Sequence, residues 1–367
     1  MLEHSEVLSY LLEKQWLDSE AVVQDQLQIV NLSRRNCNFK VVGTHSPCYF
    51  LKQGNGEVGI GTVSHEASIY QFFQQSSCLP LQSYLTPCLG YEEIRQILTL
   101  SFIQDAQDLR TYQVKHGRFT KQIATEMAKA IACLHGHFDT SKSINNQVSP
   151  DLFQDCTPWV LNAHRPQLSV LRTISEATLK LMRMIQKFPD FGDRLDALSQ
   201  SWQQTALIHG DIKFENFIVH RVPSRRKTQL KLVDWEFAGI GDPCWDIGSV
   251  FSTYLRLWIL SIPITGEVPP TEFAKLAEYP LEKMQGAIAI FWQTYCHQMA
   301  FTSIEADGYL LKSVQLGAAR LIQSALELTD LGRLTSTVVC LLQLSLNILQ
   351  KPERAATQLL GIPRGEV

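Results

Sequence analysis

The stretch HGDIKFENF at residues 209–217 concentrates reactive side chains between two apolar runs, TALI before it and IVH after it. Asp211 and Asn216 follow the spacing D-x-x-x-x-N, and His209 lies two residues ahead of Asp211. A carboxylate can accept the proton of a hydroxyl, and carboxylate and amide oxygens suit a hard cation such as Mg²⁺. These residue types therefore indicate a site that could accept a proton and hold a metal ion.

A further acid follows at the end of an expected β-hairpin. The apolar runs FIVH and LKLVDW flank the polar connection RVPSRRKTQ, and Asp234 lies near the end of the second run. Because an antiparallel hairpin brings its ends together, we expect Asp211, Asn216 and Asp234 to meet at one edge. Phosphoryl transfer needs such a set, with one carboxylate as base and oxygen ligands for a metal that neutralises phosphates.

The expected elements divide the chain into a sheet-rich part and a helical part. Residues 1–105 contain a turn-rich segment, GNGEVGIGTVS, a helix, HEASIYQFFQQ, and short strands near 28–33, 37–43, 47–53, 85–90 and 94–101. Residues 106–367 are dominated by helical patterns such as FTKQIATEMAKAIACLHGHF. We therefore predict an α+β protein with a small β-rich domain at 1–105 and a helical domain at 106–367.

Composition limits the class of partner. The net charge of −3 over 367 residues gives no electrostatic footprint for nucleic acid or an anionic membrane surface, so neither is expected as a partner. The apolar stretches SVFSTYLRLWILSIPI and TSTVVCLLQLSLNIL are too short to span a bilayer and are interpreted as buried helices. Nine cysteines without CxxC spacing, and a start without a basic signal-peptide region, predict a cytoplasmic protein with reduced thiols.

The motifs HGDIKFENFIV and LKLVDWEFAGIGDPCWDIG together resemble the aminoglycoside phosphotransferase and choline kinase family, which shares its fold with protein kinases. The matching pattern is H-G-D-x-x-x-x-N followed by D-W-E-x-A-x-x-G-D-P-x-x-D. The resemblance implies a protein-kinase-like bilobal fold, with a small β-rich N-lobe that binds the nucleotide and a larger helical C-lobe. It also implies ATP and Mg²⁺ as cofactors and an enzyme that phosphorylates an alcohol group.

The same resemblance assigns roles around the catalytic loop. By position, Asp211 would be the catalytic base, His209 would orient the loop, and Asn216 and Asp234 would be metal ligands. Asp246 would brace the loop from the following helix. From the residues alone, Asp246 could also cap the helix that begins WDIGSVF, and the two roles are compatible.

On the nucleotide side, the resemblance pairs Lys52 with the phosphates and Glu66, on the following helix, with Lys52. The stretch LTLSFIQDAQDL is similar to the family's hinge, so backbone groups from Ser101 to Ile103 would meet the adenine. Taken alone, Lys52 is typical of a solvated strand lysine and Glu66 of a first-turn acid. The order of strand, helix and hinge favours the nucleotide role.

The loop expected to cover the phosphates is SRRNCN at residues 33–38, where the family often has glycine. Arg34, Arg35 and Asn36 or Asn38 would meet the phosphates instead. The segment GNGEVG matches G-x-G-x-x-G, but it follows the Lys52 strand and is interpreted as a connector. His135 in CLHGHF is interpreted as a packed helix histidine.

The acceptor is less constrained. DIKFEN has the D-x-K-x-x-N form typical of Ser/Thr protein kinases, so Lys213 would stabilise charge on the transferring phosphate, or else be a surface lysine. LSRRNCNFKV is similar to kinases that phosphorylate ribosomally made precursor peptides in the split-enzyme class of lanthipeptide synthesis, which would imply a separate lyase as partner. The acids after residue 250 form no dense cluster for a polycationic aminoglycoside.

Three functions stay open from the sequence. The first is an ATP-dependent kinase with Ser or Thr of a peptide as the preferred acceptor, and the second is a kinase for the hydroxyl of a small antibiotic or metabolite. The third is an inactive nucleotide-binding scaffold, which the complete set of ionic residues disfavours. A wide groove would favour the peptide and a closed pocket the small molecule.

Overall fold

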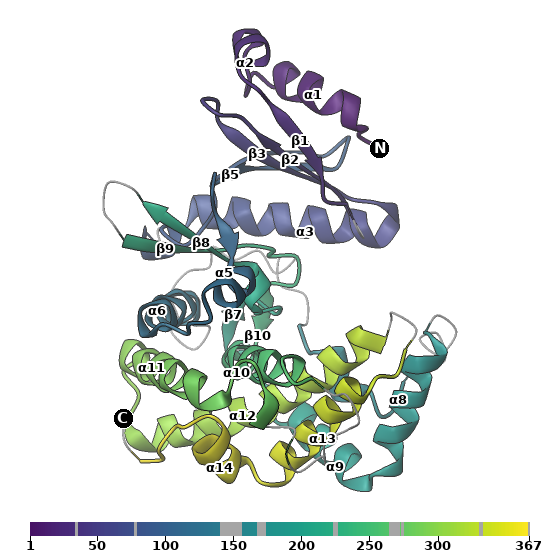
Figure 1. The fold of residues 1–367 in the computed structure, drawn as a ribbon, viewed down its shortest axis with the longest axis vertical. Helices are drawn as coiled ribbons and strands as arrows, with labels where there is room; N and C mark the ends of the chain where they lie inside the picture. Colours follow the sequence, from purple (N-terminus) through teal and green to yellow (C-terminus); the bar gives the residue numbers. More distant parts are fainter. Residues whose placement is uncertain are drawn as a thin grey trace. The chain divides into compact units, whose positions relative to one another are not determined.

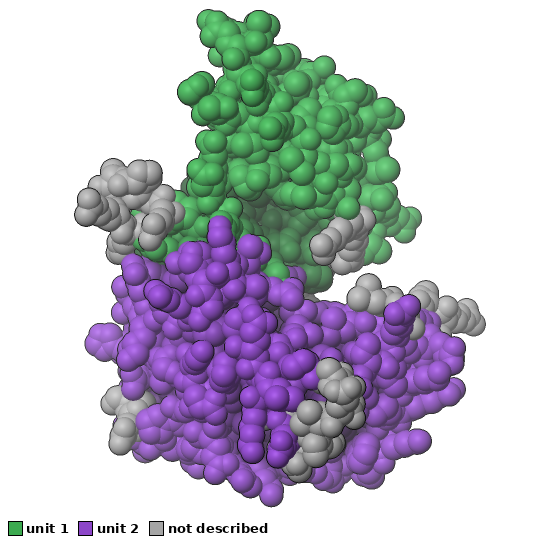
Figure 2. Space-filling model, in the orientation of Figure 1, with its two compact units in different colours: residues 1–109, 147–152, 215–238 green, residues 110–146, 153–214, 239–367 purple. Residues whose placement is uncertain are grey.

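The structure is a computed structural model that describes residues 1–33, 36–76, 79–139, 156–166, 174–222, 227–263, 272, 275–329 and 333–365. These residues form two compact units (Figure 2). Unit 1 contains residues 1–109 and 215–238, and unit 2 contains the described residues of 110–146, 153–214 and 239–367. The units are interleaved in the sequence, whereas the division expected at residues 105 and 106 is contiguous.

Unit 1 is built on a five-stranded antiparallel sheet with the strand order β1-β2-β3-β5-β4. Figure 1 labels β1, β2, β3 and β5 of this sheet. The strands are β1 (Gln28–Asn31), β2 (Cys37–Val42), β3 (Cys48–Gln53), β4 (Cys88–Glu92) and β5 (Ile97–Phe102). Each of them overlaps a strand expected from the sequence. Short helices accompany the sheet: η1 (His4–Glu6), α1 (Val7–Glu13), α2 (Ser19–Gln24) and α4 (Leu79–Gln82).

The two faces of this sheet carry different helices, because successive side chains of a strand point to opposite faces. Tyr49 and Leu51 of β3 belong to the same buried cluster as Tyr10 and Leu11 of α1. Lys52 is the next residue and points to the other face. There the long helix α3 packs on β3, β4 and β5.

Helix α3 spans Gly56–Gln75, so it begins well before the expected helix. The interpretation of GNGEVGIGTVS as a turn-rich connector was wrong for most of that segment. Glycine costs about 1 kcal/mol relative to alanine inside a helix, but packing overrides this propensity here. Val63 is fully buried, and a Cβ on Gly59 would lie only 2.5 Å from Oδ1 of Asn36, so Gly59 permits a close approach.

A second sheet of unit 1 contains the expected hairpin. Its strand order is β6-β8-β9, formed by β6 (Gln107–Asp108), β8 (Phe217–Val222) and β9 (Lys227–Leu232). Phe217 lies opposite Leu232 in the antiparallel register. The short helix η4 (Phe214–Asn216) leads into β8, so the hairpin starts directly after the catalytic-loop motif.

Unit 2 is mainly helical and also contains an antiparallel pair of strands, β7 (Ala206–Ile208) and β10 (Gly239–Gly241). Its longer helices are α5 (Leu109–His116, whose first residue is the last of unit 1), α6 (Lys121–His137), α8 (Glu176–Lys187), α9 (Pro189–Gln200), α10 (Pro243–Leu260), α11 (Leu281–Met299), α12 (Ser303–Thr329) and α13 (Ser336–Gln350). Shorter elements are η3 (Trp159–Asn162), α14 (Pro352–Arg354) and η7 (Ala355–Leu359). The α+β class is therefore confirmed, and no described helix is long and apolar enough to cross a membrane.

Helices α10 and α12 cross with direct backbone contact. A Cβ on Gly317 of α12 would lie 2.7 Å from the carbonyl oxygen of Gly248 on α10, and a Cβ on Gly248 would lie 2.6 Å from the backbone nitrogen of Gly317. Any side chain at either position would push the helices apart. The crossing fixes the spacing of two helices that carry site residues, Asp246 on α10 and Arg320 on α12.

We expect Gly317→Ala to lower the free energy of unfolding by about 1–3 kcal/mol, because the added methyl group meets backbone rather than a movable side chain. Urea unfolding followed by circular dichroism would measure the change. Gly308→Ala on the same helix is the matched control, since a Cβ there meets nothing within 4 Å. That control should gain up to about 1 kcal/mol from helix propensity, and equal losses in both variants would contradict the crossing argument.

Candidate active site

Lys52 is the centre of a buried ionic cluster in unit 1. Its Nζ lies 2.7 Å from Oε2 of Glu66, 2.6 Å from Oδ1 of Asp234 and 3.6 Å from Oε2 of Glu236. The Lys52 side chain is only 7% exposed, which excludes the alternative of a solvated strand lysine. Three residues singled out from the sequence, Lys52, Glu66 and Asp234, are thus brought together.

Two chain segments hold the acids around this lysine. Glu66 projects from α3, and Asp234 follows β9 with a φ of 71°, a left-handed conformation that Asp tolerates better than most residues. The backbone N–H of Trp235 donates to Oε1 of Glu66 at 3.3 Å. The buried Trp235 ring also packs edge-on against Phe73 of α3, with ring centroids 4.8 Å apart. Helix α3 and the segment after β9 are therefore fixed to each other beside Lys52.

The cluster contains more carboxylates than ammonium groups. Burial alone would lower the pKa of Lys52, but the carboxylates of Glu66, Asp234 and Glu236 raise it above its ordinary value. Burial raises the pKa of the Glu66 carboxyl, against the opposing effect of the Lys52 ammonium. Lys52 consequently stays charged at neutral pH, with three carboxylates around one ammonium group.

Asn216 and Asp234 lie at the same end of the hairpin. The N–H of Val233 donates to the carbonyl oxygen of Asn216 at 3.0 Å, one residue before Asp234. Among the described residues, no three or more His, Cys, Asp or Glu side chains are arranged to hold a metal ion. An amide and a carboxylate still fit Mg²⁺, because in nucleotide sites this ion takes one or two protein carboxylates and completes its shell with waters and phosphates.

In unit 2, the buried carboxylate of Asp246 holds the catalytic-loop motif. Its Oδ2 accepts the N–H of His209 at 2.7 Å, and its Oδ1 accepts the N–H of Gly210 at 3.1 Å. Gly210 has a φ of 79°, a conformation that glycine adopts without strain. Asp242, rather than Asp246, is the N-cap of α10, so the capping alternative for Asp246 was wrong.

His135 extends the contacts of Asp246 to two more helices. Nε2 of His135, on α6, lies 3.2 Å from Oδ2 of Asp246, and Nδ1 lies 2.9 Å from the hydroxyl oxygen of Tyr295 on α11. The His135 and Tyr295 side chains are buried, as expected for a packed histidine. The loop is therefore anchored to α6, α10 and α11 through one carboxylate.

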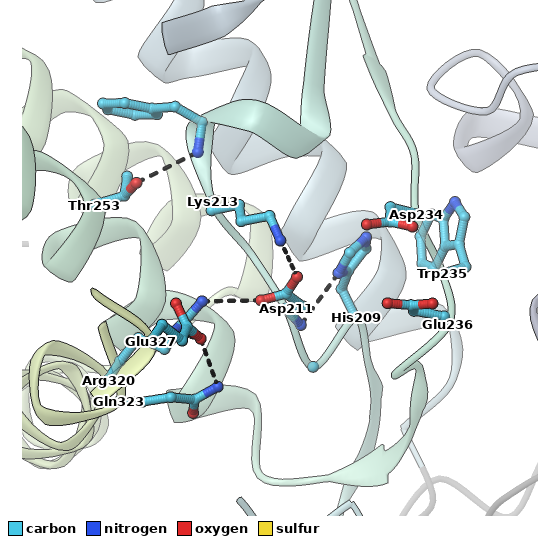
Figure 3. A network of polar contacts seen from close by, with 12 residues as sticks. His209, Asp211, Lys213, Asp234, Trp235, Glu236, Thr253, Arg320, Gln323 and Glu327 are labelled. Atoms are coloured by element: carbon cyan, nitrogen blue, oxygen red, sulfur yellow. Dashed lines mark hydrogen bonds and ion pairs between the residues drawn. The ribbon is translucent and has the colours of Figure 1, made fainter. Parts of the chain in front are cut away.

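Asp211 meets two cations (Figure 3). Nζ of Lys213 lies 2.5 Å from Oδ2 of Asp211, and Nη2 of Arg320 lies 2.9 Å from Oδ1. The backbone N–H of Asp211 donates to Nδ1 of His209 at 3.3 Å. Burial alone would raise the pKa of Asp211, but Lys213 and Arg320 hold it below its ordinary value. The carboxylate is therefore ionised at neutral pH and able to accept a hydrogen bond from a hydroxyl.

The remaining residues singled out from the sequence are placed less fully. Arg34 and Arg35 lie outside the described residues. Asn36 is buried, and its Oδ1 has no hydrogen-bond partner in the described part of the chain. Ser101 and Ile103 lie at the end of β5 and just after it, and the N–H of Ser101 already donates to the carbonyl of Pro87 at 2.9 Å.

Sequence reasoning missed Glu236, Arg320 and Glu327. Glu236 could have been found, since it belongs to the motif DWE that was singled out for Asp234. The sequence signal for Arg320 is a basic residue inside the small and apolar run LGAARLIQSAL, where burial of a charge needs a partner. Glu327, on the same helix, accepts from Nη1 of Arg320 at 3.0 Å.

The fold and these two ionic clusters define a protein of the kinase-like class. Residues 27–269 match the model of the phosphotransferase enzyme family (APH), a range that holds Lys52, Asp211 and Asp234 and covers more than half of the chain. The chain belongs to this family. The predicted relationship to aminoglycoside phosphotransferases and the prediction of a kinase are thereby confirmed, whereas the finer relationship to lanthipeptide kinases stays a prediction.

Several solved structures share this fold at low identity. Aminoglycoside phosphotransferase APH(2'')-Ib with bound ADP is 12% identical, with 95% of this chain and 99% of that chain covered and a TM-score of 0.53. A choline/ethanolamine kinase family protein from Mesorhizobium loti is 14% identical, with 98% and 97% covered and a TM-score of 0.50. Amicoumacin kinase hAmiN, in complex with AMP-PNP, Ca²⁺ and Ami, is 13% identical, with 95% and 96% covered and a TM-score of 0.50.

A curated relative matches a shorter stretch. Acyl-CoA dehydrogenase family member 10 from Mus musculus is 26% identical over 135 residues, which are 36% of this chain. The match spans 11% of the length of that relative.

We expect Asp246→Asn to lower the free energy of unfolding by about 1.5–3 kcal/mol, because an amide offers a single oxygen to two buried N–H donors that now share a carboxylate. Thermal and urea unfolding would measure the loss. Asp307→Asn is the control, since Asp307 pairs with Arg364 at the surface and should be nearly neutral. A loss no larger than in the control would show that Asp246 does not hold the loop.

Proposed function

We propose that the protein transfers the γ-phosphoryl group of ATP to an alcohol hydroxyl. The observation that carries this proposal is the buried ammonium of Lys52 between Glu66 and Asp234. Kinase-like enzymes use a lysine held by a helical acid, next to a metal-binding Asp, to fix the phosphates of the nucleotide. Membership of the phosphotransferase family supports the same reaction.

On the nucleotide side, the Lys52 ammonium pairs with the phosphates, and Glu66 keeps the ammonium in place. Asp234, whose side chain is 30% exposed, and Asn216 are the residues that would hold Mg²⁺. The bound ion supplies neutralisation of the phosphate charge. These assignments are supported by the surplus of carboxylates around Lys52.

Further nucleotide contacts come from two segments. By the resemblance of their loop to the family's phosphate-covering loop, Arg35 and Asn36 would contact the phosphates. The backbone at residues 101–103 would meet the adenine. Because the N–H of Ser101 is engaged with Pro87, we assign the donor to the N–H of Ile103.

On the acceptor side, Asp211 is the base. The hydroxyl oxygen forms a bond to the γ-phosphorus while the bond from that phosphorus to the bridging oxygen of ADP breaks. The hydroxyl proton passes to the carboxylate of Asp211, and Lys213 stabilises the charge on the phosphoryl oxygens. His209 and Asp246 act by holding the loop and touch no reacting atom.

For the acceptor, we propose a small-molecule hydroxyl, by similarity to the aminoglycoside phosphotransferase and the choline/ethanolamine kinase family protein. The acids after residue 250 form no dense cluster in the sequence, which disfavours a polycationic acceptor. A peptide Ser or Thr is the second candidate, favoured by the contact of Lys213 with Asp211. A separate lyase would belong to that candidate, and a cytoplasmic location is proposed for both.

We expect Asp211→Ala to lower kcat roughly 100- to 10,000-fold, because the proton acceptor is lost, while the Kd for ATP stays within about threefold. ADP formation with Mg²⁺ would be measured against panels of small alcohols, aminoglycosides and Ser/Thr peptides, with products weighed for an added phosphate. Asp190→Ala, an exposed acid on α9, is the control and should behave as the wild type.

Which panel gains a phosphate decides between the two acceptor candidates. Full turnover by Asp211→Ala would overturn its role as base. ATP binding without phosphorylation of any acceptor would favour the inactive scaffold instead.

We expect Asp234→Ala to weaken Mg²⁺-dependent ATP binding at least about tenfold, because a charged metal ligand is removed. Calorimetric titration with and without Mg²⁺ separates this effect from direct contact with the nucleotide. Glu236→Gln, which changes an acid 3.6 Å from Lys52, is the matched control and should have the smaller effect. Equal Mg²⁺ dependence in Asp234→Ala and the wild type would rule out the ligand role.

A further inference from the structure

Arg320 is a fully charged side chain in the interior of unit 2. It lies on α12 and is only 4% exposed. A buried guanidinium is costly unless ionic partners and hydrogen bonds meet it, and an apolar residue of similar size often serves stability better. The charge at this position therefore points to a use other than stability.

The guanidinium bridges two carboxylates. Nη2 lies 2.9 Å from Oδ1 of Asp211, and Nη1 lies 3.0 Å from Oε1 of Glu327. Glu327 is in turn held by Nε2 of Gln323 at 3.1 Å. Arg320, Gln323 and Glu327 all lie on α12 (Figure 3). Contacts within this one helix therefore orient the planar guanidinium group of Arg320 toward Asp211.

The two cations on Asp211 differ in how firmly they are held. The side chain of Lys213 is 34% exposed, on a flexible stem, whereas that of Arg320 is 5% exposed and tied to Glu327. They also approach different oxygens, Lys213 at Oδ2 and Arg320 at Oδ1. Lys213 is thus the more accessible of the two cations, whereas moving Arg320 would take a buried charge away from its Asp211 partner.

We propose that Arg320 is a positioning residue for the base: it fixes Asp211 by Oδ1, so that Oδ2 is exchanged between Lys213 and the acceptor hydroxyl. On this proposal, which rests on the proposed function, Lys213 moves to the transferring phosphoryl group as the hydroxyl takes its place. Arg320 stays on Oδ1 throughout and touches no reacting atom. One oxygen of Asp211, Oδ1, thus keeps the carboxylate oriented, while the other, Oδ2, changes its hydrogen-bond partner.

The electrostatics follow from the same contacts. Lys213, Arg320 and His209 are charged or titratable groups of unit 2 that act on Asp211, and they lower its pKa below the ordinary value in spite of burial. Replacing Arg320 by an uncharged residue leaves Asp211 buried but removes one of the cations that stabilise its ionised form. The pKa of Asp211 should therefore rise in a variant without that charge.

The test uses the full-length protein with Arg320→Met and Arg320→Lys. Carboxyl-¹³C aspartate labelling reports the titration of Asp211, whose signal is assigned by its loss in Asp211→Asn. We expect the Asp211 titration to move to higher pH in Arg320→Met and to stay near the wild type in Arg320→Lys. Using the panel acceptor that gives turnover, or water where none does, we expect kcat to fall roughly 100-fold in Arg320→Met, with the KM for ATP within about threefold.

The control is Lys312→Met, which removes another α12 cation, one that lies 2.5 Å from Asp242. An unchanged Asp211 titration in Arg320→Met, or an equal loss of kcat in Lys312→Met, would overturn the proposal. If Arg320→Met does not fold, the kcat of Arg320→Lys tests the proposal, because a lysine keeps the positive charge but lacks the two-pronged guanidinium group that contacts both Asp211 and Glu327. Wild-type kcat in that variant would also overturn it. A wild type without any turnover would refute the proposed function, and the titration would still test the contact.

Discussion

A charge taken out of water is stable only where an opposite charge or several donors meet it, and the polar clusters of both units depend on this constraint. Lys52 is buried because Glu66 and Asp234 accompany it. Asp246 is fully buried because two backbone N–H groups and His135 surround it. Lys52 and Asp246 are each confined to a small range of positions, since neither side chain can move far without losing its partners. The polar side chains are therefore set in place by the packing of the elements that carry them.

The sequence predicted the residues that act through local spacing. The motif around Asp211, the hairpin up to Asp234 and the order of the Lys52 strand and the Glu66 helix depend on short stretches of sequence, and each can be followed in the structure. Arg320 lies 109 residues from Asp211, so only tertiary packing of α12 brings them together. The early start of α3 was missed for the same reason, because the close approach of Asn36 at Gly59 is a long-range contact.

The proposed roles divide the ionic residues into two groups, one for the nucleotide and one for the acceptor. In the proposed function, the pair of Lys52 and Glu66 serves the nucleotide, which kinases of this class share. In the proposed function, the surroundings of Asp211 serve the hydroxyl that is phosphorylated, and they include residues from outside the motifs, on α12. Because one fold serves many acceptors, substrate identity has to be read from this second group rather than from the fold.

The glycine contact between α10 and α12 has a consequence for how the enzyme could be altered. Gly248 lies two residues after Asp246, and Gly317 lies about one turn before Arg320, so the contact sets the distance between two polar anchors of the loop. Neither glycine has a side chain that could meet a substrate. In a laboratory search for variants that accept new substrates, substitutions at these two glycines would impair activity as substitutions of active-site residues do. The exposed side of α12 would be the part open to variation.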